Sequence, residues 1–188
     1  MKKDISLAIA FFSSLIVSAC VTVPQDSQVN KNQIVISSVR DIPISYTPGS
    51  KFSLAPKYVE ETSLKPNQTQ LVYKLYADAI IADLESHGFN NTSDAINSDF
   101  HVGFGIALAS DLSDKTINDK FGITPGLPNN DELKKGSFLI YIEDTSTGKK
   151  VWRGAAQGFA HEDSDVEQRA QLTISIVSRV MTQFYVTN

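Results

Sequence analysis

The residues with the most distinctive chemistry in this chain are a single cysteine, Cys20, and three histidines. His87, His101 and His161 are spread along the sequence, and none has a second ligand at a spacing that binds metal. The Gly-Phe-Gly stretch at 103–105 lacks the third glycine of a dinucleotide site, and no nucleophile stands in a Gly-x-Ser-x-Gly elbow. The sequence therefore predicts no metal, no cofactor and no catalytic residue.

The N-terminus has the composition of an export signal. Lys2 and Lys3 give it a basic start, and a mostly apolar run follows from Ile5 to Val17. This run is shorter than the roughly 20 residues that a helix needs to cross a bilayer, and it has the length of the hydrophobic region of a signal peptide. We therefore expect residues 1–19 to be a signal peptide that is removed on export.

The four residues Val17-Ser18-Ala19-Cys20 resemble the bacterial lipobox, in which an aliphatic residue and two small residues precede a cysteine. The resemblance implies cleavage before Cys20 and acylation of its sulfur and its new amino group with fatty acids such as palmitate. Val21, next in the chain, implies an anchor in the inner leaflet of the outer membrane, with the protein facing the periplasm. The other interpretation is an ordinary secretory signal cut after Ala19. It would leave Cys20 as an incidental thiol, which has no second cysteine for a disulfide.

Charge and hydropathy limit the partners. The chain has 17 basic and 21 acidic residues, for a net charge of −4. An acidic domain without Lys and Arg clusters argues against nucleic acid as a partner and against a polybasic membrane-binding surface. No later apolar run approaches membrane-spanning length. Membrane lipid is therefore expected as a partner through acylated Cys20, with an envelope protein or cell-wall component as a further partner.

The rest of the chain is long enough for one domain with its own hydrophobic core. Residues 20–33 are polar and predict a lipidated cysteine followed by a flexible tether with a reach of roughly 20 Å. Residues 34–188 predict a single α+β domain, a two-layer sandwich whose mainly antiparallel sheet has two helices packed on one face. Alternation and helical spacing place strands over 34–46, 51–55, 99–109, 137–144 and 149–159, and helices over 67–87 and 164–185.

Both predicted helices have an apolar stripe and capping signals. Asn67 with Gln70, and Ser164 with Glu167, have the spacing of a capping box, and Gly88 suits the left-handed end of the first helix. The stripes consist of Leu71, Val72, Leu75, Tyr76, Ala79, Ile80 and Leu84 in the first helix and Val166, Ala170, Ile174, Val177, Val180, Met181 and Phe184 in the second.

Small residues mark the faces of two strands. In the strand over 99–109 they alternate with large apolar residues, so a helix, an aromatic ring or a ligand can approach the backbone there. In the strand over 149–159, Trp152 shares a face with Gly154, which predicts an indole ring packed over glycine. Residues 110–135 between the strands are long and polar and contain glycine and proline. We expect a loosely packed loop there, and the first place to look for partner recognition.

Four segments resemble the lipoproteins grouped as domain of unknown function 4136. They are Asp41 to Phe52, Gly88-Phe89, Asp99 to Val102, and Asp144 to Gly154, of which the last is the most specific. The resemblance covers the chain from about residue 35 to its C-terminus. It implies an α+β fold and a location in the cell envelope, and it implies no activity, because that family has none assigned.

We expect a non-enzymatic binding or structural module. Trp152, Arg153 and His101 form the candidate surface for a ligand or partner. One alternative is an enzyme that modifies envelope polymers through residues such as Asp99, His101 and Arg153, and another is an accessory subunit of an envelope transport or assembly complex. A pocket that gathers two or more titratable side chains would favour the enzyme, and an apolar groove would favour the binding module.

Overall fold

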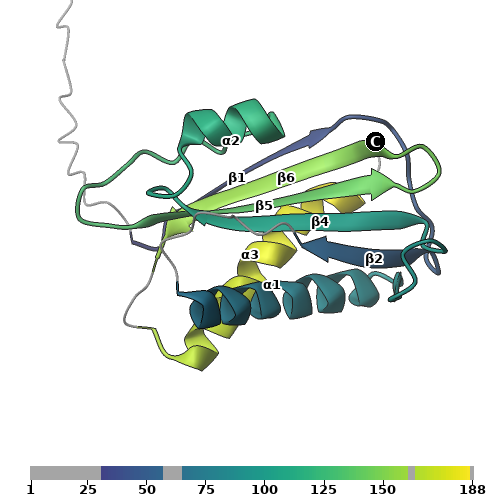
Figure 1. Ribbon diagram of the computed structural model, residues 1–188, viewed down its shortest axis with the longest axis horizontal. Helices are drawn as coiled ribbons and strands as arrows, with labels where there is room; N and C mark the ends of the chain where they lie inside the picture. Colours follow the sequence, from purple (N-terminus) through teal and green to yellow (C-terminus); the bar gives the residue numbers. More distant parts are fainter. Residues whose placement is uncertain (1–30, 57–64, 161–163, 187–188) are drawn as a thin grey trace, which may run out of the picture.

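The computed structural model describes residues 31–56, 65–160 and 164–186 (Figure 1). The four lipobox residues Val17, Ser18, Ala19 and Cys20 lie outside the described residues, as does the predicted tether up to residue 30. The described elements follow in the order β1 (Ile34–Arg40), β2 (Lys51–Pro56), α1 (Pro66–Ser86), β3 (Asn90–Asn91), β4 (Phe100–Leu108), α2 (Asp114–Phe121), β5 (Lys135–Asp144), β6 (Lys149–Phe159) and α3 (Val166–Tyr185).

The strands form one open sheet in the order β1-β6-β5-β4-β2-β3. The β1–β6, β6–β5 and β5–β4 pairs are antiparallel, whereas β2 runs parallel to β4 and β3. The chain passes from β2 to β4 through α1, as a parallel pair requires a crossover connection. The prediction of a mainly antiparallel α+β fold is confirmed.

Helices cover both faces of this sheet (Figure 1). Alternate residues of β5 point to opposite sides, so that Phe138 and Ile140 join the main core with α1 and α3, while Leu139 joins a smaller core with Ile117 of α2. The prediction of two helices on one face is therefore wrong in one respect, because the described chain has a third helix on the other face.

The helix α2 lies inside the segment that we predicted to be a loose loop. Ser113 caps it by accepting a hydrogen bond from the Thr116 backbone N–H at 3.2 Å, and Gly122 ends it with a φ of +66°. The helix has only two apolar residues, Ile117 and Phe121, of which Ile117 is buried, so its sequence shows little apolar periodicity. The segment is packed against the sheet rather than loose, since Leu127 beyond the helix is only 1% exposed.

The predicted helix starts are each displaced by one or two residues. The helix α1 begins at Pro66, whose fixed φ suits a first helical position, and so Asn67 lies within the first turn instead of capping it. The helix α3 is capped by Asp165, whose carboxylate accepts a hydrogen bond from the Gln168 N–H at 2.8 Å. The predicted end at Gly88 is confirmed by its φ of +88°.

The predicted apolar stripes were partly wrong in the N-terminal halves of both helices. Leu71 of α1 and Ile174 of α3 are about half exposed, at 48% and 50%, and Val166 is 66% exposed. Tyr73 and Thr173 are buried instead. Tyr73 turns inward because its hydroxyl accepts a hydrogen bond from the Ile106 backbone N–H of β4 at 3.2 Å.

The first strand ends at Arg40, six residues before the predicted end. Beyond it, Asp41 and Ile42 both donate their backbone N–H groups to the Val151 carbonyl, and the ladder with β6 stops. The guanidinium of Arg40 turns to the end of α3, where it donates to the Phe184 carbonyl at 2.7 Å. The apolar residues after the strand, Ile42, Ile44 and Tyr46, still pack against the main core.

Candidate functional site

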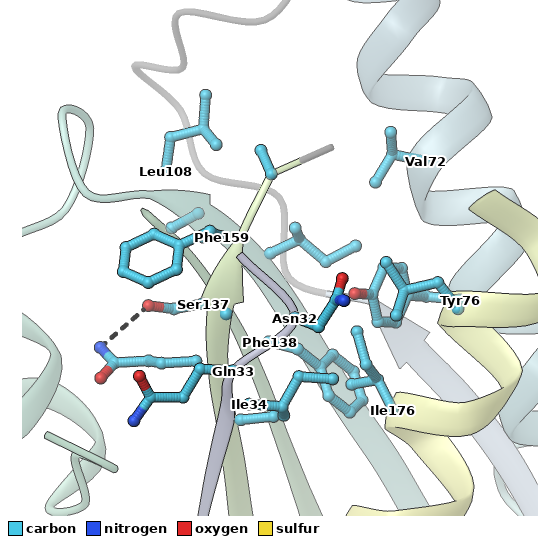
Figure 2. Close-up of a pocket in the computed structure, with 18 of the residues that line it drawn as sticks. Asn32, Gln33, Ile34, Val72, Tyr76, Leu108, Ser137, Phe138, Phe159 and Ile176 are labelled. Carbon is cyan, nitrogen blue, oxygen red and sulfur yellow. Dashed lines mark hydrogen bonds between the residues drawn. The ribbon is translucent and has the colours of Figure 1, made fainter. Parts of the chain in front are cut away.

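An apolar pocket of about 220 Å³ lies where the described chain begins, between α1, α3 and the sheet (Figure 2). Residues 31–33, which precede β1, form part of its wall. Its lining consists of residues 31–34 before and at the start of β1, Val72 and Tyr76 of α1, Leu172 and Ile176 of α3, and residues 106–108, 136–138 and 156–160 of the sheet and its ends.

Side chains from both layers form the apolar wall. Figure 2 shows Ile34, Tyr76, Phe138 and Ile176 on one side of the pocket, and the rings of Tyr76 and Phe138 lie 4.7 Å apart between centroids at an angle of 31°. Burial raises the pKa of the Tyr76 hydroxyl well above its ordinary value. The phenol is therefore neutral over the whole physiological range and adds no charge to the pocket.

The polar lining residues Ser137 and Gln157 are already paired with one another and with the segment that carries α2. Gln157, 1% exposed, donates through Nε2 to Ser137 Oγ at 3.2 Å and to Asp114 Oδ1 at 2.7 Å. Its Oε1 accepts from the backbone N–H groups of Gly126 and Leu127 at 3.1 and 3.0 Å. These groups hold the segment on the sheet, and a ligand would have to break existing bonds to use them.

The chemistry of this lining suits binding. Lys31 is the charged residue among those that form the pocket, and the lining contains no histidine, cysteine, aspartate or glutamate. The titratable side chains of the lining are Lys31 and Tyr76, and the Tyr76 hydroxyl stays protonated. Among the described residues, the lining therefore offers no carboxylate, imidazole or thiol for acid–base chemistry. Among the described residues, no group of three or more His, Cys, Asp or Glu side chains could hold a metal ion.

Trp152, one of the three predicted surface residues, belongs to the core. It is 1% exposed, packs on the ring of Phe184 at 5.5 Å between centroids, and covers Gly154 as predicted. Burial of the indole between sheet and helix leaves none of it for a partner at the surface.

Arg153 follows Trp152 in the strand and therefore points to the opposite face. Its guanidinium donates to both carboxylate oxygens of Asp41, at 2.7 and 2.5 Å, and to the Phe121 carbonyl at the end of α2. The hydrogen bonds to Asp41, with the negative charge of its carboxylate, raise the pKa of Arg153. The side chain ties the segment after β1 to the end of α2.

His101 lies on the same face of the sheet as Arg153 but on β4, two strands away, and both it and Asp99 make local contacts. The Nδ1 of His101 lies 2.6 Å from Ser53 Oγ and 3.4 Å from Ser98 Oγ, and Asp99 accepts a hydrogen bond from the Lys51 N–H at 2.7 Å. Ser53 and Ser98 are 4% and 5% exposed. The structure thus does not gather Trp152, Arg153 and His101, and none of them lines the apolar pocket.

The small-residue face of β4 receives an aromatic ring. A Cβ on Gly103 would lie 2.0 Å from the ring of Tyr141, so only glycine leaves room for that phenol. The Nζ of Lys150 lies over the same ring, 4.7 Å from its centroid. Of the helix, aromatic ring or ligand that the sequence left open for this face, the aromatic ring is therefore confirmed.

Sequence reasoning missed the pocket, although it placed Val72 and Tyr76 on the inner face of α1. Leu172 and Ile176 lie outside the predicted stripe of α3. Leu71 and Ile174, which belonged to the predicted stripes, are about half exposed. The two helices therefore have more apolar residues near the pocket than the sheet covers, and this excess was the signal in the sequence.

These features define an α+β protein with an open six-stranded sheet and an apolar pocket at one end of its helical layer. The chain belongs to the family described as Domain of unknown function (DUF4136), whose model matches residues 44–184. This confirms the family resemblance found in the sequence.

Two solved structures share the fold. A DUF4136 family protein from Bacteroides thetaiotaomicron is 13% identical, with a TM-score of 0.50 over 80% of this chain and 95% of that one. A PDZ domain protein from Parabacteroides distasonis is also 13% identical, with a TM-score of 0.52 over 84% of this chain and 37% of that one. No curated protein matches the sequence. In the described part of the chain, none of the helices has the length and hydropathy to span a bilayer.

Proposed function

We propose that this protein is a lipoprotein of the cell envelope, anchored through acyl chains on Cys20, and that its folded domain is a binding module and not an enzyme. The lipobox residues and the apolar leader support the anchor. One observation carries the binding role, namely a pocket with an apolar wall and no histidine, cysteine, aspartate or glutamate among the described residues that line it.

The proposed ligand is an apolar group of the size of part of an alkyl chain. An apolar cavity of about 150 Å³ stays dry and binds benzene, and the pocket here is larger, at about 220 Å³. Each methylene that leaves water for such a site contributes about 0.8 kcal/mol, so a few methylenes give measurable affinity. The ammonium group of Lys31 suits a ligand whose polar end is anionic.

The position of the pocket fits an envelope role. Lys31 follows Cys20 by only eleven residues in the sequence, and a fully extended chain of that length spans at most about 40 Å. An acylated Cys20 would therefore keep the pocket within this distance of the membrane surface, where alkyl chains are abundant. The inner leaflet of the outer membrane remains our proposal for the anchor, from Val21.

The alternative of an enzyme for envelope polymers has one contact in its favour, the short distance between Ser53 Oγ and His101 Nδ1. A hydroxyl nucleophile next to an imidazole base is the arrangement of many hydrolases. Both Ser53 and its neighbour Ser98 are buried, however, and a substrate would have to displace packed residues to reach them. An accessory role in a transport or assembly complex would be tested by pull-down from crosslinked envelopes.

Substitution of Val72 by tryptophan is expected to weaken binding of a dansyl-labelled undecanoic acid about tenfold or more. Val72 lines the pocket, and an indole there would take space from the ligand. Each displaced methylene removes about 0.8 kcal/mol, and about 1.4 kcal/mol is a factor of ten in the dissociation constant. The measurement is a fluorescence titration of the purified full chain.

The matched control is Leu71→Trp, one residue earlier in α1. Leu71 is half exposed and does not line the pocket, so this variant should bind the probe like the unmodified protein. Equal loss in both variants, or no binding by the unmodified protein, would contradict the pocket as an alkyl-chain site.

Substitution of Cys20 by serine is expected to move the protein from the membrane fraction to the soluble fraction. Serine has no sulfur to acylate, and each buried acyl methylene contributes about 0.8 kcal/mol to anchoring. Intact-mass measurement of the unmodified protein should show added lipid on Cys20, and the variant should lack it. A Ser18→Ala variant keeps a small residue before the cleavage site and should still be lipidated.

The competing interpretation makes a different prediction for the same measurement. An ordinary signal cut after Ala19 would give a mature chain of unmodified mass, found in the soluble fraction whether residue 20 is cysteine or serine. That result would remove the anchor from our proposal and leave the pocket to be tested separately.

A further inference from the structure

The two edges of the sheet are built differently. One edge ends in β3, which has two residues and pairs with only the start of β2. The other edge is β1, whose seven residues from Ile34 to Arg40 all pair with β6 on one side and, among the described residues, have no strand on the other. The backbone N–H and C=O groups on that outer side can pair with a further strand.

Within the part of the chain that the structure describes, the β1 strand lacks the sequence features that usually protect a free edge. Residues 34–39 include no charged residue and no proline, and the ladder between β1 and β6 runs without a bulge. Native proteins blunt such edges with lysine, proline, bulges or very short strands. Arg40 ends the strand, but its guanidinium is turned to the carbonyl groups of Ile44 and Phe184.

Space beside β1 allows another strand to approach. A wide groove of about 530 Å³ lies between β1 and the outer side of α3. Its walls are mostly polar, and its volume leaves room for an added strand and its side chains. They are formed by Ile36, Ser37 and Ser38 of the strand and by Arg179, Thr182 and Gln183 of the helix.

We propose that β1 pairs antiparallel with β1 of a second copy of this chain, about a two-fold axis that passes through Ser37. Each residue of β1 then stands opposite the residue of the second copy that lies equally far from Ser37 in the other direction along the strand. Val35 meets Val39 of the second copy, Ile36 meets its Ser38, and Ser37 meets Ser37. The two sheets become one continuous sheet, and both helical layers stay on the same side.

The residues of β1 fit this arrangement on each face. The Val35–Val39 contacts cover Val39, which is 39% exposed in the single chain. No charged side chain stands opposite another across the axis, because the one charged residue, Arg40, is paired with Ile34. A partner of different sequence would find no charge on residues 34–39 to recognise, whereas a second copy matches the apolar and small residues in register.

The arrangement is also compatible with two anchors in one membrane. With about 3.4 Å per residue in an antiparallel strand, the two Ile34 residues lie roughly 20 Å apart. The 14 residues from Cys20 to Ile34 can span up to about 50 Å in each copy. The pairing itself does not depend on lipidation or on the pocket, so it can be tested whether or not those proposals hold.

The register is tested by disulfide crosslinking of the full chain in intact cells. In a Ser37→Cys variant the two Cα atoms at the axis would lie about 4.5–5.5 Å apart, within the range of a disulfide. The matched control is Ser38→Cys, where the two positions lie about 7–8 Å apart diagonally, too far for a disulfide without backbone movement. After mild oxidation we expect most of the Ser37→Cys chain as a dimer on non-reducing gels. We expect only background dimer for Ser38→Cys and for the unmodified chain.

A second measurement keeps the proposal testable if the cysteine variants fold poorly. The molar mass of the unmodified full chain in mild detergent should be that of a dimer. Val39→Lys places an ammonium group on the edge opposite Val35 of the second copy and should give a monomer. Val39→Thr, which keeps the branched shape, should stay dimeric. A monomeric unmodified chain, equal crosslinking at 37 and 38, or a crosslink to a different protein would each overturn the pairing.

Discussion

Substitution of Asp114 by alanine is expected to lower the free energy of unfolding by about 3 kcal/mol. The carboxylate of Asp114, in the first turn of α2, accepts a hydrogen bond from Lys135 Nζ at 2.6 Å and another from Gln157 Nε2 at 2.7 Å. The Lys135 side chain is only 3% exposed. Without Asp114, its ammonium group would be left in the interior with only the Leu127 carbonyl, 3.1 Å away, as an acceptor among the described residues.

The expected size of this loss follows from the difference in burial between Lys135 and Asp114. Removal of one partner from a buried ion pair costs about 3–5 kcal/mol, because the other charge stays behind without compensation. Asp114 is itself 38% exposed, and water can partly replace it, so we expect the lower end of this range. For a chain of this length, that loss lowers Tm by roughly 6–12 °C.

The control for this prediction lies in the same helix. Asp119 pairs with Lys115 at 2.6 Å, but both side chains are exposed, at 55% and 86%. Asp119→Ala should therefore change stability by less than about 0.5 kcal/mol. Thermal and urea unfolding of both variants would measure the difference. Similar stability of the two variants would show that the Lys135 contact does not hold the α2 segment to the sheet.

Substitution of Gly154 by alanine is expected to destabilise the fold by about 3 kcal/mol, although it adds a single methyl group. A Cβ at this position would lie 2.4 Å from Cη2 of Trp152 and 2.7 Å from Cγ1 of Val180. Those neighbours are 1% and 0% exposed. Neither can move into solvent, so the helix α3 would have to shift from the sheet or the indole would have to leave its rotamer.

Gly158 is the matched control, because it is on the same strand and the same face. A Cβ there would meet its nearest atoms at 3.5 Å, which is an ordinary contact distance. Gly158→Ala should therefore be close to neutral, while Gly154→Ala should lower Tm by roughly 6–12 °C. A neutral Gly154→Ala would show that the indole does not lie over the glycine as described. The result would also test whether the Trp152-Arg153-Gly154 segment, the most specific part of the family resemblance, is a packing unit.

Local patterns in the sequence were enough to predict most of the elements. The strands from 99 to 159 and both long helices follow from two-residue alternation and helical spacing, which depend only on which residues must be buried. Gly88 had to end α1 because the chain there needs a positive φ. Trp152 beside Gly154 predicted a ring over a glycine, since a large and a small residue on one strand face can pack no other way without a void.

The helix α2 could not be recognised in the same manner. Its residues are polar apart from Ile117 and Phe121. Hydrogen bonds from Gln157 and Lys135, which are 43 and 21 residues away from Asp114 in the sequence, hold it in place. Propensity within the segment says little when the stabilising contacts come from distant strands. Contacts with distant strands also decide which side of a helix is buried, and so Leu71 and Ile174 were assigned to the wrong side of their helices.

The sequence by itself determined the acidic charge and the α+β class, and it is the sole basis of the leader and the lipobox around Cys20 that we propose, because each depends on residue types and local patterns. Only the tertiary structure decided which of those residues could act together. It buried Trp152, separated it from Arg153 and His101, and placed Val72, Tyr76 and Ile176 around one apolar pocket. A pocket exists where layers fail to cover one another completely, and that depends on how two helices and a sheet meet in space.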